Sequence, residues 1–166
     1  MIWAMCPTRY QDLFRFSVSL DVRWRDVDSL GHVNNAVYFT YLEHAYVHYM
    51  RELRLAWPTA DGVGFIIAHA SCDYRAPLYL AEQVTIHARV THIGRSSLEF
   101  DYRLEGGDGR LVANGRTVQV CYDYSQNRPV PILATWREAI LDYEPGLHQQ
   151  VDLSTQETDP WPLHST

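Results

Sequence analysis

The chain has 166 residues, of which 46% are hydrophobic and 13% aromatic, so it can bury the core of one domain and is not a disordered chain. Its formal net charge is -6, whereas nucleic-acid-binding proteins carry a basic surplus, so we expect no nucleic-acid partner. The apolar patterns stop near residue 143, and the remainder is polar with several prolines. We therefore expect a single domain over residues 1–143 and a loosely held tail over residues 144–166.

The three cysteines, Cys6, Cys72 and Cys121, are far apart and lack the C-x-x-C spacing of zinc sites and redox motifs. An odd number of separated thiols argues against a disulfide framework and fits a reducing compartment. The N-terminal residues do not form a signal peptide, and no apolar run reaches the length of a membrane span. We expect a cytoplasmic protein that has no membrane partner.

Residues 14–25 alternate between apolar side chains, from Phe14 to Trp24, and polar or charged ones. This period of two predicts a long strand with one buried face and one face in water. A turn marked by Ser29 and Gly31 follows, and then two asparagines, either of which can cap a helix.

Residues 36–55 contain neither glycine nor proline and predict a helix, which at about 1.5 Å per residue is roughly 28 Å long. The apolar residues cover most of the circumference, which predicts a helix surrounded by other structure. His44 and His48 have the i, i+4 spacing of metal ligands, but there is no H-E-x-x-H motif and no evident third ligand. We expect neither a metal ion nor a cofactor.

Strand patterns return after residue 58. They predict strands over residues 64–74, 84–91, 97–104 and 111–123, a hairpin loop at residues 105–109, and a short helix over residues 132–143. Strands joined by hairpins pair antiparallel, and a curved antiparallel sheet can wrap one helix and leave its outer face in water. The predicted fold is therefore an α+β hotdog fold, in which a curved antiparallel β-sheet wraps one long central helix.

The turn that enters the helix contains Asp28, and the first N–H groups of a helix have no intrahelical acceptor. A carboxylate beside these donors suits attack on an acyl carbon, because the helix end can hold the resulting oxyanion. A thiol has a pKa of about 8.5, so it leaves a thioester without a strong acid, and few polar groups suffice. There is no G-x-S-x-G motif. An aspartate at a turn is also a common capping residue, so the residues alone leave both roles open.

The segment R-D-V-D-S-L-G-H-V-N-N-A-V-Y-F-T-Y-L-E resembles the signature of hotdog-fold acyl-CoA thioesterases, the 4-hydroxybenzoyl-CoA thioesterase superfamily. The common form of that signature is D-x-D-x-x-G-x-V before a helix that carries a conspicuous Tyr. The later segments D-Y-R-A-P-L-Y-L, I-G-R-S-S and V-C-Y-D-Y-S-Q-N-R-P-V-P-I also resemble the family, over about residues 14–142 in all. The resemblance implies that Asp28 is the catalytic carboxylate, as nucleophile or general base. It also implies a homodimer or homotetramer that binds acyl chains between subunits.

The other predicted site residues support Asp28. The supporting catalytic candidates are His32, Asn34 and Asn35, although His32 can equally bond to the loop backbone and the two asparagines suit capping. The predicted oxyanion donors are the backbone N–H groups of Val33 and Asn35. The predicted substrate-binding residues are Gly31, Tyr38, Arg95, Ser96 and Ser97. Asp26 is expected to be a surface or salt-bridged residue at the strand end.

The predicted reaction is hydrolysis of an acyl-CoA thioester to a free carboxylic acid and CoA. An acyl-ACP thioester is the alternative substrate, and an acyl-CoA-binding module without catalysis is the alternative function. The presence of Asp28 argues against the non-catalytic binding module.

Overall fold

The computed structural model describes residues 13–55, 58–144 and 146–147. In chain order the elements are β1 (Phe16–Asp21), a 3-10 turn η2 (Trp24–Asp26), α1 (Asn35–Glu52), β2 (Val63–Tyr74), β3 (Gln83–Ile93), β4 (Ser97–Gly106), β5 (Leu111–Asp123), β6 (Arg128–Pro129) and α2 (Ala134–Tyr143). No helix in these ranges is long and apolar enough to cross a membrane.

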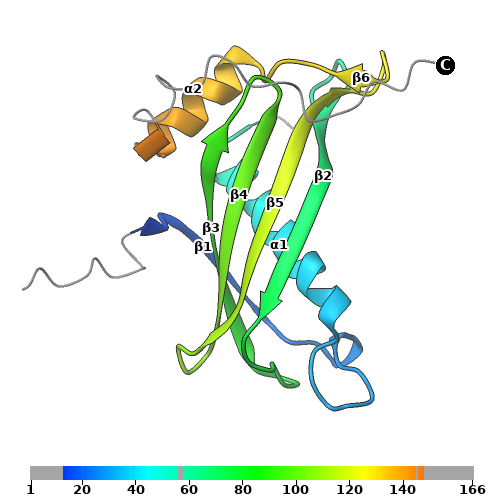
Figure 1. Cartoon of the computed structure of the whole chain (residues 1–166), viewed down its shortest axis with the longest axis vertical. Helices are drawn as coiled ribbons and strands as arrows, with labels where there is room; N and C mark the ends of the chain where they lie inside the picture. Colours follow the sequence, from blue (N-terminus) through cyan, green and yellow to red (C-terminus); the bar gives the residue numbers. More distant parts are fainter. Residues whose placement is uncertain (1–12, 56–57, 145, 148–166) are drawn as a thin grey trace, which may run out of the picture.

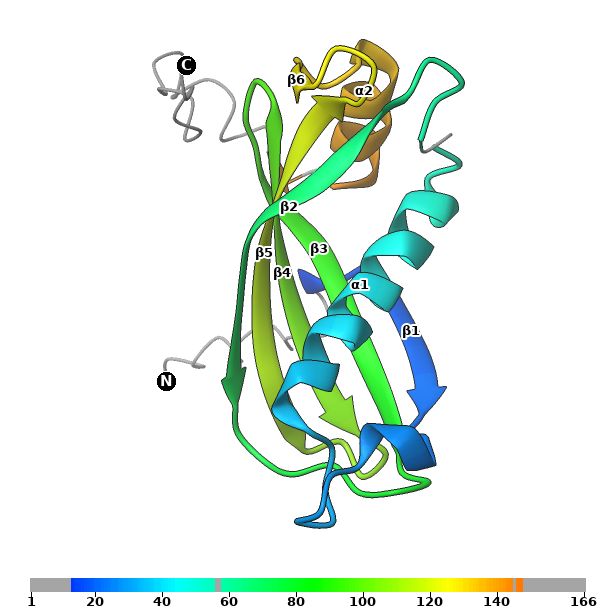
Figure 2. The same ribbon diagram turned by 90° about the vertical axis from the view of Figure 1, so that its right-hand side faces the viewer.

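The strands form one antiparallel sheet in the order β1-β3-β4-β5-β2, and the short β6 pairs with the end of β5. The sheet is strongly curved and α1 runs along one of its faces, whereas α2 lies at the end where β3 turns into β4 (Figures 1 and 2). This is the predicted hotdog fold. The strands β1 and β2 are its two edges.

Helix α1 packs on the sheet through one stripe rather than through its whole circumference. Its buried residues are Tyr38, Tyr41, Leu42, Ala45, Tyr46, Tyr49 and Met50. Phe39, Thr40 and Glu43 are exposed on the other side. The prediction of a helix enclosed on all sides is therefore wrong for a single chain, because the sheet of one chain covers only one side of the helix.

The first strand is shorter than predicted. It ends at Asp21, and the chain then enters η2, where Trp24 is 75% exposed and Asp26 is buried. The chain that follows the strand is fixed by a backbone hydrogen bond, in which the Val22 N–H donates to the Glu82 carbonyl at 2.8 Å. The 3-10 turn breaks the alternation of the strand, so the predicted inward position of Trp24 is wrong.

The predicted tail is packed where it begins. Glu144 and Leu147 are both buried. The Glu144 Oε1 atom accepts hydrogen bonds from the Tyr49 hydroxyl at 3.0 Å and from the Val90 N–H at 3.3 Å. Burial raises the pKa of the Glu144 carboxyl. The prediction of a loosely held segment is wrong for these residues, and residues 148–166 lie outside the described ranges.

Candidate active site

The loop between η2 and α1 closes on itself before the helix begins. Val27 and Val33 form an isolated antiparallel bridge, and the Asp28 N–H donates to the His32 carbonyl at 3.0 Å. Gly31 adopts φ +82°, and no atom lies within 4 Å of the place where a Cβ would stand. This glycine is therefore required by its backbone conformation rather than by close packing.

The Asp28 carboxylate lies at the tip of this loop and is half-buried. Its Oδ1 atom accepts a hydrogen bond from the Leu30 N–H at 2.8 Å, as in an Asx turn. Its Oδ2 atom lies 3.5 Å from the Asn34 side-chain Nδ2. These contacts hold one carboxylate oxygen toward the residue that caps α1.

Asn34 is the N-cap of α1, as predicted for one of the two asparagines. Its side-chain oxygen accepts from the Ala36 N–H at 2.9 Å, and its carbonyl accepts from the Val37 N–H at 3.0 Å. The Asn34 N–H itself donates to the Asp26 carbonyl at 2.9 Å. Asn34 therefore links Asp28 and the helix start.

The Val33 N–H donates to the Leu78 carbonyl at 2.8 Å. The prediction that Val33 supplies an oxyanion donor is therefore wrong, because the loop between β2 and β3 already occupies this amide. Among the described residues, the Asn35 N–H donates no hydrogen bond. As the first residue of α1, Asn35 presents this amide at the positive end of the helix dipole.

Three side chains with rings, His32, Tyr38 and Tyr74, lie around the start of α1. The Nδ1 atom of His32 lies 3.4 Å from the Val33 carbonyl, so its ring contacts loop backbone. Tyr38 is buried with its ring edge-on to Tyr74 at 5.0 Å, and burial raises the pKa of Tyr38 to about 12. The Tyr74 hydroxyl donates to the Asn35 carbonyl at 2.9 Å. Tyr74 is not among the predicted residues, although it ends a strand directly before the turn that carries Pro77.

The predicted CoA-binding residues do not join Asp28 within one chain. Arg95 and Ser96 lie in the turn between β3 and β4, and Ser97 begins β4, next to α2. The Asp28 loop lies at the other end of the sheet, beside the loop between β2 and β3 (Figure 2). The ten residues of β4 separate the two ends, which at about 3.4 Å per residue is roughly 30 Å.

Neither described cysteine is poised as a nucleophile. Burial raises the pKa of Cys72 and of Cys121 to about 11, so both thiols stay protonated near neutral pH. Within the described ranges no three His, Cys, Asp or Glu side chains are placed to hold a metal ion. The rings of His44 and His48 do lie 4.4 Å apart on α1.

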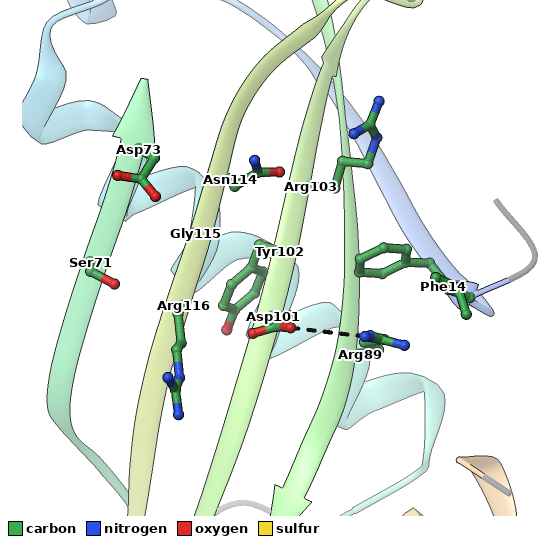
Figure 3. A pocket seen from close by; sticks show the side chains of 11 residues that line it. Phe14, Ser71, Asp73, Arg89, Asp101, Tyr102, Arg103, Asn114, Gly115 and Arg116 are labelled. Carbon is green, nitrogen blue, oxygen red and sulfur yellow. Dashed lines mark ion pairs between the residues drawn. The ribbon is translucent and has the colours of Figure 1, made fainter. Parts of the chain in front are cut away.

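A hollow of about 400 Å³ lies on the outer face of the sheet, with α1 behind it (Figure 3). Its cations face carboxylates, because Arg89 lies 3.9 Å from Asp101 and Arg116 pairs with Glu99. It contains neither Asp28 nor the start of α1. The hollow therefore contains none of the catalytic residues predicted from the sequence.

The chain is thus a hotdog domain that fixes a carboxylate beside the start of its central helix. The profile of the Thioesterase-like superfamily matches residues 22–140. The chain belongs to the Thioesterase-like superfamily and is a thioester hydrolase.

Individual relatives agree with this assignment. The chain is 26% identical over 123 residues to the long-chain acyl-CoA thioesterase FadM of Escherichia coli K12, covering 73% of this chain and 93% of that protein. It is 27% identical over 119 residues to the acyl-CoA thioester hydrolase YbgC of Escherichia coli O6:H1, covering 70% and 87%. A thioesterase of Thermus thermophilus, solved with coenzyme A and zinc, is 34% identical with a TM-score of 0.72, covering 81% of this chain and 97% of that one.

Proposed function

We propose that the protein hydrolyses an acyl-CoA thioester to a free carboxylic acid and CoA, with Asp28 as the catalytic carboxylate. The observation that carries this proposal is the junction at the start of α1. There, the Asp28 carboxylate contacts the N-cap residue Asn34, and the Asn35 N–H donates no hydrogen bond to a described residue. The names of FadM and YbgC, both acyl-CoA thioester hydrolases, support CoA as the carrier.

The chemistry needs only these groups and water. In the general-base route, Asp28 takes a proton from water while the water oxygen bonds to the acyl carbon. The carbonyl oxygen becomes negative and is held by the Asn35 N–H. When the C–S bond breaks, CoA leaves as thiolate and takes the proton. In the nucleophilic route, an Asp28 oxygen bonds to the acyl carbon and expels the thiolate, and water then hydrolyses the mixed anhydride.

A panel of acetyl-, octanoyl-, palmitoyl- and benzoyl-CoA, with a matching acyl carrier protein thioester, tests the substrate class. We expect release of free thiol from at least one acyl-CoA. Binding of these compounds without thiol release would instead favour the non-catalytic module. Turnover of only the carrier-protein thioester would reassign the carrier.

A second copy of the chain completes the proposed site, because one chain leaves it open. The edge strand β2 has 12 residues and one neighbour, β5. Its residues 67–71 are exposed, and the strand contains no lysine or proline to protect the edge. Antiparallel pairing of two β2 strands about a two-fold axis brings the Arg95 end of the partner sheet to the Asp28 end of this one. The CoA ligands predicted from the sequence then reach the site from the partner.

The substitution Ala70→Lys on β2 is expected to convert dimers into monomers, because it places a charge on the pairing edge. Light scattering after size exclusion measures the change. Ser17→Lys on the opposite edge strand, β1, is the matched control and should leave the mass unchanged. Monomers for the unaltered chain, or equal masses for both variants, would contradict pairing through β2.

A further inference from the structure

The side chain of Asp26 is a buried carboxylate next to the proposed catalytic loop. Its residue is 3% exposed. Its Oδ2 atom accepts from the Arg23 N–H at 3.0 Å, from Arg23 Nε at 2.9 Å and from the Tyr41 hydroxyl at 2.9 Å, and its Oδ1 atom accepts from Arg23 Nη2 at 3.0 Å. Burial alone raises the pKa of this carboxyl, but the hydrogen bonds from Arg23 and Tyr41 outweigh burial and hold the pKa below its ordinary value. Asp26 is thus a fully bonded anion inside the fold.

These bonds join the base of the Asp28 loop to the body of α1. On one side, the Asp26 carbonyl accepts from the Asn34 N–H at 2.9 Å, directly beneath the Val27–Val33 bridge. On the other side, Tyr41 lies six residues after the start of α1, which is about 9 Å along the axis. The position of the Asp28 loop relative to the Asn35 N–H therefore depends on where the Asp26 carboxylate is held.

We propose that Asp26 is a positioning residue, which acts through Tyr41 and Arg23 to hold Asp28 in register with the first amide of α1. This inference rests on the proposed role of Asp28. It follows because attack on an acyl carbon tolerates little displacement, and an error of about 1 Å can cost on the order of 10²-fold in rate. Among the described residues, the Asp28 side chain makes one hydrogen bond toward the helix start, the 3.5 Å contact with Asn34.

Helix α1 offers a matched control for this role. Tyr41 and Tyr49 are both fully buried, and each hydroxyl donates to a buried carboxylate, Asp26 at 2.9 Å and Glu144 at 3.0 Å. Only the Tyr41 bond ends next to the Asp28 loop, on the last residue of η2, since Glu144 follows α2. A comparison of variants at the two tyrosines therefore distinguishes the effect of losing a buried hydrogen bond from the effect of losing the position of the Asp28 loop.

The experiment compares Tyr41→Phe with Tyr49→Phe in steady-state hydrolysis of the acyl-CoA that the wild type turns over best. Both variants keep the aromatic ring, so we expect both to fold. Asp26→Asn is a poorer test, because it removes the anion that pairs with Arg23 and so disturbs folding itself. For Tyr41→Phe we expect kcat to fall by about tenfold or more, with KM within about twofold of wild type, because catalytic geometry rather than binding is disturbed. For Tyr49→Phe we expect both constants to stay within about twofold of wild type, even if its thermal midpoint falls as far as that of Tyr41→Phe.

Equal kcat values for the two variants would overturn the positioning role. The Asp28→Asn variant shows whether such a result concerns only Asp26 or the proposed function as a whole. If Asp28→Asn is inactive while Tyr41→Phe matches Tyr49→Phe, only the role of Asp26 is lost. If Asp28→Asn turns over at the wild-type rate, the proposed function of the junction is itself wrong.

Discussion

The substitution Asp28→Asn is expected to lower kcat for thioester hydrolysis by about 10²- to 10⁴-fold, because it removes the group that takes up a proton or attacks the acyl carbon in the proposed mechanism. KM should change little, since in the proposed mechanism Asp28 acts on the acyl carbon rather than on the CoA moiety. Asparagine can still accept the Leu30 N–H, which the Asp28 Oδ1 atom bonds at 2.8 Å, so the loop should keep its shape. Thiol release measured under saturating acyl-CoA gives the result.

Asp108 provides the control for this substitution. Its Oδ1 atom accepts from the Arg110 N–H at 3.1 Å, so it makes the same i, i+2 turn contact at the hairpin between β4 and β5. Asp108→Asn should leave kcat near the wild-type value. Full turnover by Asp28→Asn, or an equal loss in both variants, would remove Asp28 from the chemistry.

Gly115→Ala is expected to destabilise the fold by about 1–3 kcal/mol, because the added methyl overpacks the contact between α1 and β5. A Cβ at Gly115 would stand 2.7 Å from Cδ1 and 2.9 Å from Cδ2 of Leu42, which is 1% exposed. The Leu42 side chain is buried in the core, so moving it away from the methyl disturbs its other packing contacts. Urea unfolding monitored by circular dichroism measures the loss.

The same substitution should behave differently in a Leu42→Ala background. Leu42→Ala alone opens a cavity and costs about 2–5 kcal/mol. Adding Gly115→Ala there should be neutral or stabilising, because the clash is gone and the methyl fills part of the cavity. An equal cost of Gly115→Ala in both backgrounds would show that Leu42 is not the limiting contact.

The regular elements could be predicted because their patterns come from neighbouring residues in the chain. In strand β4 the alternating residues Leu98, Phe100 and Tyr102 are all buried, as their spacing predicts. The same alternation overestimates the extent of β1, because it continues through η2, whose turn is stabilised by the bonds between Arg23 and Asp26. The alternation of apolar and polar residues does not show where the strand ends and the 3-10 turn begins.

The Asp28 loop could be located from sequence, but its donors could not be assigned. Whether an amide at the helix start is free depends on the Leu78 carbonyl, which reaches Val33 from a loop 45 residues further on. The separation of Arg95 from Asp28 likewise follows from the lengths and order of the strands rather than from local pattern. Tertiary contacts, and not propensity, therefore decide which predicted residues meet.

The most direct test is a crystal structure of the Asp28→Asn variant with an acyl-CoA that the wild type hydrolyses. We predict that the thioester carbonyl oxygen lies about 2.7–3.1 Å from the Asn35 N, with the acyl carbon beside residue 28. The CoA moiety should extend toward Arg95 of the partner subunit across the β2 edge. A thioester bound in the outer-face hollow of β2, β5, β4 and β3, or one with no contact to the Asn35 amide, would contradict the proposed site.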